Sequence, residues 1–189
     1  MTIDLATWPR QRRIYHPIQR DAAIFLETAE ESGGARTLLE VELAPGGRNE
    51  PHRHLTYAER FQPVDGDLTV RLGRSPTVLS PGQQVIAPPG AAHSFANDSE
   101  RAVRFLVELT PGHRGFEQAL QIGYGLARDG RCDARGLPRD VRHLAVLGQM
   151  SDMRLCGAMR ALEPAMLAMA RRAIARGLDA ELIERYVAW

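Results

Sequence analysis

Apolar and polar residues alternate along three stretches near the middle of the chain, residues 36–44, 59–72 and 103–109. A period of two residues is typical of a strand that buries one face, because successive strand side chains point to opposite sides. Glycine and proline residues lie between the stretches and favour tight turns. The pattern therefore predicts a mainly β protein built from short strands that pack as two layers.

The first stretch shows the alternation most clearly. Leu39, Val41 and Leu43 should face the core of the sheet, and the intervening Glu40 and Glu42 should face solvent.

The second stretch contains two local signals. Asp65-Gly66 is typical of a hairpin turn between two strands. Pro63 lies inside the strand that precedes this turn and cannot donate a backbone hydrogen bond, so we expect that strand to be at an edge or locally bulged.

Residues 1–35 precede the alternating pattern and contain one short apolar run, Ile24–Leu26. Because Gly33 and Gly34 supply a turn soon afterwards, we predict that residues 24–28 form a strand at the edge of the sheet, after an N-terminal arm.

The spacing of apolar residues changes to a helical period after Pro111-Gly112. The predicted helical segments are residues 116–126, a segment opened by Pro138 and reaching 147, residues 162–176, and a last helix capped by Asp179 and ending at Tyr186. We therefore expect three parts: residues 1–35 as arm and edge strand, 36–112 as the β core, and 113–189 as a C-terminal helical extension packed on that core.

The composition narrows the function classes. A chain of 189 residues fits the roughly 100–200 residues of one domain, and its net charge of +1 argues against nucleic-acid binding. No apolar run approaches the ~20 residues of a membrane span, and the N-terminus lacks the apolar core of a secretory signal. We expect a cytoplasmic protein with no membrane partner, in which Cys132 and Cys156 are reduced thiols.

Four residues carry the candidate chemistry. His52 and His54 are two positions apart, so a strand would direct both imidazoles to the same face. Glu59 lies at an odd offset from His54, and only a bend through residues 55–58 would bring its carboxylate back to that face. His93 would supply a third imidazole, and such a donor set suits a divalent metal ion with positions left for substrate or water.

Two segments of the chain resemble the paired motifs of the cupin superfamily, G-x5-H-x-H-x4-E-x6-G and G-x5-P-x-G-x2-H-x3-N. Every fixed position is present: Gly46, His52, His54, Glu59 and Gly66, then Gly82, Pro88, Gly90, His93 and Asn97. The resemblance implies a double-stranded β-helix, the jelly-roll barrel, over the β core. It also implies that His52, His54, Glu59 and His93 hold the metal, with Fe(II) favoured and Mn, Ni, Zn or Cu as alternatives.

Further residues near the motifs are candidates for the active site. Glu59 would also serve as a general base, as resemblance to quercetinase-like cupins implies. Tyr57 is a candidate catalytic hydroxyl close to Glu59 in the sequence, and Phe61 and Phe95 are expected to form the apolar wall of a substrate pocket. The remaining histidines, His16, His113 and His143, are expected at the surface or in a lid.

Three functions remain open at this point. The favoured one is a metal-dependent oxygenase, a dioxygenase acting on a small aromatic or enolic substrate. The second is a redox-neutral isomerase, lyase or cyclase, for example on a polyketide-type substrate, and the third is a metal or small-molecule binding module without turnover. A homodimer is expected, because the edges of a jelly roll need to be covered.

Overall fold

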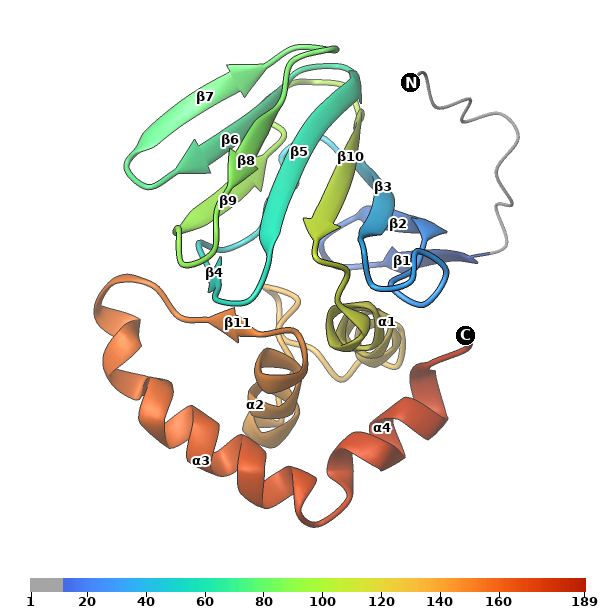
Figure 1. The fold of residues 1–189 in the computed structure, drawn as a ribbon, viewed down its shortest axis with the longest axis vertical. Helices are drawn as coiled ribbons and strands as arrows, with labels where there is room; N and C mark the ends of the chain where they lie inside the picture. Colours follow the sequence, from blue (N-terminus) through green and yellow to red (C-terminus); the bar gives the residue numbers. More distant parts are fainter. Residues whose placement is uncertain (1–11) are drawn as a thin grey trace.

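The computed structural model describes residues 12–189 and shows a two-sheet β barrel followed by helices (Figure 1). Its larger sheet contains, in spatial order, β1 (Arg13–His16), β2 (Asp21–Glu27), β3 (Thr37–Leu43), β10 (Val103–Thr110), β5 (Ala58–Asp65) and β8 (Val85–Ala87). The smaller sheet contains β7 (Ser75–Leu79), β6 (Leu68–Leu72) and β9 (His93–Ala96). All neighbouring strands are antiparallel, and the predicted jelly-roll fold is confirmed.

The inward faces of the two sheets form the main core, as the alternation predicts. Leu39 and Leu43 are 1% exposed, and Phe61 and Phe105 are fully buried. Glu40 is also buried, although it was expected to face solvent, because its carboxylate pairs with Arg104 on the neighbouring strand at 3.2 Å. Burial along β3 therefore exceeds what a strand with one wet face would show.

The turn at Asp65-Gly66 is present, but the predicted hairpin is wrong. Gly66 has a φ of 80°, which favours glycine. The strands on either side do not pair with each other, because β5 belongs to the larger sheet and β6 to the smaller one. The turn is thus a crossing between the two layers.

The prediction for Pro63 is confirmed. The pairing of β10 with β5 shifts register between Arg104 and Phe105, which is the position of a bulge opposite Pro63 and Asp65. On its other side, β5 pairs with β8 only as far as Phe61. Pro63 therefore has no partner in β8 to which a backbone N–H would have to donate.

The predicted strand at residues 24–28 corresponds to β2, which begins three residues earlier, at Asp21. The edge of the sheet is β1, a strand that the sequence pattern missed. Its four residues include only two of strand-forming type, Ile14 and Tyr15, so the local signal is weak. Residues 1–11, part of the predicted arm, lie outside the described residues.

The C-terminal extension consists of helices gathered at one end of the barrel, beside the short paired strands β4 (Arg53–His54) and β11 (Met153–Arg154) (Figure 1). These helices are α1 (Arg114–Arg128), α2 (Val141–Met150), a 3₁₀ helix (Gly157–Leu162), α3 (Glu163–Ile174) and α4 (Leu178–Tyr186). They share a second core that includes Ile122, Leu126, Val146 and Leu182. None of the helices within residues 12–189 has the length and apolar character needed to cross a membrane.

Two helix starts differ from the prediction. The side chain of Asp140 accepts from the Arg142 backbone N–H and caps α2, so Pro138 lies before the helix rather than in its first turn. Gly177 precedes α4 with a left-handed backbone, and Asp179 lies inside the first turn. An acidic residue is favourable both at the N-cap and in the first turn of a helix, so the sequence alone does not fix at which residue these helices begin.

Replacing Phe105 by Ala tests the core. The ring is fully buried and packs on Phe95 at a centroid distance of 5.1 Å. We expect a loss of about 3–5 kcal/mol in the free energy of unfolding, measured by urea denaturation. Val78 on β7 is 60% exposed, so Val78→Ala should change that free energy by less than about 0.5 kcal/mol. Similar losses in both variants would contradict this description of the core.

Candidate metal site

The structure brings the four predicted residues together at the end of the barrel next to the helices. His54 lies in β4, and His52 lies just before that strand. Glu59 comes from β5 and His93 from the start of β9. All four side chains are buried, and one ligand atom from each lies within 4.8 Å of the others. The expected bend is also present, because β4 ends at His54 and β5 begins at Ala58.

Backbone pairing places the first and last histidines side by side. The His52 N–H donates to the His93 carbonyl at 3.0 Å, and the His93 N–H donates to the His52 carbonyl at 2.8 Å. The two imidazole centroids are 4.5 Å apart. His52 and His93, which belong to different motifs and lie 41 positions apart, therefore meet through a two-bond bridge.

Backbone carbonyls set the orientation of two of the three rings. His52 Nδ1 lies 2.8 Å from the Glu50 carbonyl, and His93 Nδ1 lies 3.0 Å from the Ala91 carbonyl. A carbonyl only accepts, so each Nδ1 donates. The Nε2 atoms of both rings are then directed at the shared centre of the cluster, which is the arrangement that metal-binding histidines use.

His54 has a different partner. Its Nδ1 lies 2.7 Å from the Tyr57 hydroxyl, which in turn lies 2.8 Å from the Ser151 carbonyl. Its Nε2 is buried without a hydrogen-bond partner among the described residues. An unpaired buried nitrogen is costly unless a ligand occupies the centre that it faces.

The charges of the cluster are coupled. Although burial opposes ionisation of Glu59, the hydrogen bond with His93 at 2.7 Å and the nearby imidazoles hold the pKa of Glu59 below its usual range. Burial alone would lower the pKa of His93, but the bond to Glu59 raises it above the usual range. Burial lowers the pKa of His52, and it lowers the pKa of His54 to about 4. At neutral pH the cluster contains an ionised carboxylate and at least two neutral imidazoles.

These observations fit a metal ion. Neutral imidazole nitrogens and one carboxylate are the donors that first-row divalent metals prefer, and the unpaired His54 Nε2 lies 3.6 Å from a Glu59 oxygen across the centre. The His-His-Glu-His cluster could therefore bind one such ion.

The other predicted site residues lie around this cluster. Tyr57 is 1% exposed and stacks on His54 with ring centroids 4.4 Å apart. Its hydroxyl contacts Nδ1, on the side of the ring away from the cluster, so this contact does not offer the free acid/base group that was expected. Phe61 is 5.7 Å from His93 and 5.9 Å from Phe95, centroid to centroid, so Phe61 lies next to the cluster and Phe95 lies next to Phe61.

The expectation for the remaining histidines is wrong in part. His16 and His143 are buried rather than at the surface. His113 lies one layer behind the cluster, where its ring is 5.0 Å from that of Tyr57 and its Nδ1 accepts from the Phe116 N–H to cap α1. No motif marks these positions, and their burial depends on helices whose docking the sequence does not reveal.

Sequence reasoning missed Asp152. One carboxylate oxygen accepts from the backbone N–H of Leu55 at 2.7 Å, the N–H of Thr56 at 2.8 Å and the Thr56 hydroxyl at 2.9 Å. Asp152 thus fixes the bend between His54 and Glu59 from almost 100 positions away. In the sequence, Asp152 shows only as an aspartate just after a predicted helix. In the structure its φ is 54°, a left-handed conformation that aspartate adopts more readily than most residues.

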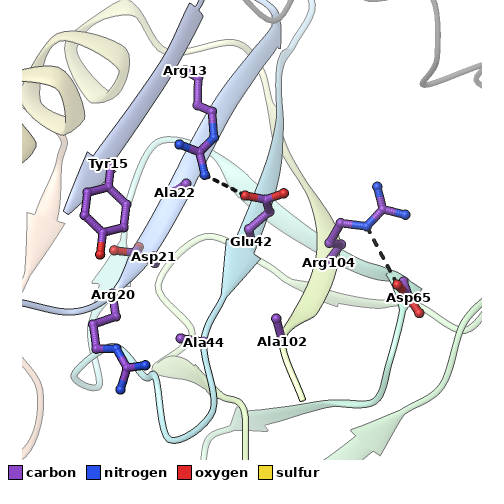
Figure 2. Close-up of a pocket in the computed structure, with 10 residues that line it drawn as sticks. All are labelled: Arg13, Tyr15, Arg20, Asp21, Ala22, Glu42, Ala44, Asp65, Ala102 and Arg104. Carbon is purple, nitrogen blue, oxygen red and sulfur yellow. Dashed lines mark hydrogen bonds and ion pairs between the residues drawn. The ribbon is translucent and has the colours of Figure 1, made fainter. Parts of the chain in front are cut away.

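A separate surface hollow lies on the larger sheet, away from the four ligands (Figure 2). It is lined by Arg13, Tyr15, Arg20, Asp21, Ala22, Glu42, Ala44, Asp65, Ala102 and Arg104. Figure 2 shows Arg13 paired with Glu42 and Arg104 directed at Asp65. An anionic ligand would have to compete with these carboxylates, so we place the candidate function in the buried cluster.

A jelly-roll barrel that encloses a His-His-Glu-His cluster defines a class of small metal-site proteins. Residues 39–108 match the family model described as "Cupin domain". This part of the chain is therefore a cupin domain. The matched segment ends before α1, so the helical extension lies outside the family model.

Similar proteins agree with this assignment. Germin-like protein subfamily T member 3 from Arabidopsis thaliana is 31% identical over 75 residues, which are 37% of this chain and 33% of that protein. The match thus spans only a third of the curated relative's length.

Two solved structures share the fold. An RmlC-like cupin from Shewanella frigidimarina has a TM-score of 0.50 and 15% identity, covering 58% of this chain and 93% of that one. A predicted oxalate decarboxylase from Thermotoga maritima has a TM-score of 0.50 and 18% identity, covering 59% and 99%.

Metal loading tests the site. A divalent ion at 100 times its dissociation constant should stabilise the protein by about 2.7 kcal/mol, visible as a higher Tm that a chelator reverses. His52→Ala should abolish both the shift and the near-stoichiometric metal found by elemental analysis. His143→Ala, which removes a buried histidine from α2, should retain both. Metal bound equally by all three proteins would place it elsewhere.

Proposed function

We propose that this protein is a mononuclear metal-dependent oxygenase that acts on a small organic substrate. One observation carries the proposal: three imidazole groups and one carboxylate, all buried, converge on a single point inside the barrel. A donor set of histidines with one carboxylate is typical of non-haem Fe(II) sites that keep open positions. Fe(II) is therefore the metal that we favour, with Mn, Ni, Zn or Cu as alternatives.

Each residue of the cluster has a proposed role. His52, His54 and His93 would hold the ion through neutral Nε2 atoms, and Glu59 would hold it through a carboxylate oxygen. The bound ion would supply a site where dioxygen and an ionised substrate hydroxyl meet. Glu59 would also accept the proton of that hydroxyl, because the hydrogen bond with His93 and the nearby imidazoles keep the carboxylate ionised although it is buried.

The surroundings favour a small substrate with an apolar or planar part. Phe61 lies beside His93 and Phe95 lies beside Phe61, and both rings would contact such a substrate. The net charge of the protein is +1, so its overall charge does not favour a strongly charged ligand. An enolic or aromatic hydroxy compound fits these conditions.

A second function uses the same site without oxygen. The Glu59 carboxylate, which lies 2.7 Å from His93, is a proton acceptor inside the site. A redox-neutral isomerase, lyase or cyclase would need such a group to move a proton within its substrate. This reading favours a metal other than iron.

Oxygen uptake separates the two functions. We expect the protein loaded anaerobically with Fe(II) to consume one O2 per substrate molecule with a member of a panel of enolic and aromatic hydroxy compounds. Both atoms of ¹⁸O2 should appear in the product by mass spectrometry. Glu59→Gln should lower kcat by about 10²–10⁴, the range for loss of a general base.

Other results would contradict the oxygenase. Conversion of a panel compound at an undiminished rate without oxygen would support the redox-neutral enzyme instead. Metal binding without any turnover, with iron or with the other metals, would leave a binding module.

A further inference from the structure

We propose that Tyr57 is a positioning residue for His54, and that the C-terminal extension holds Tyr57 in this role through Ser151 and Asp152. The inference rests on the proposed metal site and adds to it a contribution from outside the cupin domain. In this role, Tyr57 determines which ring nitrogen of His54 carries the hydrogen.

The hydrogen-bond directions follow from chemistry. The Ser151 carbonyl can only accept, so the single hydrogen of the Tyr57 hydroxyl is donated to it. The Tyr57 oxygen must then accept at its other contact, from His54 Nδ1. His54 therefore carries its hydrogen on Nδ1 and presents the lone pair of Nε2 to the centre of the cluster.

The backbone explains why His54 needs a side chain for this purpose. His52 and His93 donate to carbonyls two residues before them, those of Glu50 and Ala91. The equivalent carbonyl for His54 is that of His52, which already accepts from the His93 N–H in the bridge between these two residues. The same pairing that brings the motifs together engages the carbonyl that His54 would otherwise use.

Without this restraint, a different hydrogen position would be favoured. Glu59 Oε2 lies 3.6 Å from His54 Nε2, on the side of the ring that faces the centre of the cluster. A negatively charged oxygen at that distance stabilises a hydrogen on Nε2, the nitrogen that a metal requires as a lone-pair donor. Tyr57 acts against this preference.

Packing restricts the position of Tyr57. The ring is stacked between His54 and the helical extension, with an interplanar angle of 25° to the imidazole. His113, the cap of α1, lies 5.0 Å from it, and Phe116 in the first turn of α1 lies 6.2 Å away, centroid to centroid. The ring is 1% exposed, so the hydroxyl has no route to water as an alternative partner.

The extension is fastened to the ligand-bearing segment at several points. In β11, Met153 pairs with His54 and Arg154 with Arg53. Arg53 binds the Glu163 carboxylate at the start of α3 with contacts of 2.7 and 3.0 Å.

Asp152 adds the most local of these restraints. It joins the bend after His54 by three hydrogen bonds. It also forms an ion pair with Arg154 at 3.0 Å, which keeps its carboxylate oriented.

Tyr57→Phe removes the hydroxyl and keeps the ring. We expect metal affinity to fall by about 10–100-fold, the usual effect of losing the partner of a ligating histidine. Affinity is measured by competition with a chromophoric chelator. Tyr124→Phe is the matched control, because it removes a buried hydroxyl that bonds Asp21, away from the cluster, and should leave affinity unchanged.

A second readout does not involve metal. ¹⁵N NMR of the imidazole rings in the chelator-treated protein should show His54 with its hydrogen on Nδ1. In Tyr57→Phe the form with hydrogen on Nε2 should gain population, while Tyr124→Phe should keep the wild-type spectrum. A purely structural role for the hydroxyl would lower Tm without changing this distribution.

The role of the extension is tested with Asp152→Ala, for which we expect roughly a tenfold loss of affinity at a Tm that still shows a folded protein. Wild-type affinity in this variant would overturn the part assigned to Asp152.

Wild-type affinity and an unchanged imidazole spectrum in Tyr57→Phe would overturn the positioning role and leave the metal site standing. If the wild-type protein bound no metal, the proposed function would fail, and the imidazole spectra would still decide the role of Tyr57.

Discussion

Burying three imidazoles and a carboxylate inside an apolar barrel is the constraint on which the rest of the structure depends. Each ring has two nitrogens, and a buried nitrogen without a partner costs free energy. One nitrogen of each ring faces the common centre, so the other must be satisfied by the surrounding chain. Two carbonyls from the local backbone do this for His52 and His93. For His54 the barrel has no free carbonyl in the equivalent place, and the partner comes from Tyr57 and Ser151.

The carboxylate adds a second constraint. Glu59 is 5% exposed, and an isolated charge at that depth would be strongly unfavourable. Its contacts with His93 and His54 offset this cost and tie β5 to β9 and β4, which come from both sheets and the short pair of strands. The site therefore contributes to holding the two layers of the barrel together at the end where the helices are packed.

Much of the barrel could be predicted from the sequence, because its signals are local. The alternation along β3 and β10 and the spacing of His52, His54 and Glu59 depend on residues that are close in the chain, and the residues around His93 form a local motif of their own. Which strands pair with each other is not decided locally. The turn at Asp65-Gly66 therefore suggested a hairpin between β5 and β6, which lie in different sheets and do not pair. The surroundings of the site were hidden for the same reason. Nothing near Asp152 or His113 in the sequence indicates that they pack against residues 54–57.

The pairing of β11 with β4 changes the meaning of the boundary near residue 112. In sequence it separates a strand pattern from a helical one, and the family model stops at residue 108. In three dimensions, hydrogen bonds cross it, because the Tyr57 hydroxyl donates to the Ser151 carbonyl and the Leu55 N–H donates to the Asp152 carboxylate. The barrel and the helices are therefore poor units for exchange between proteins. A chimera that kept this barrel and replaced the helices would inherit all four ligands and lose the restraint on one of them.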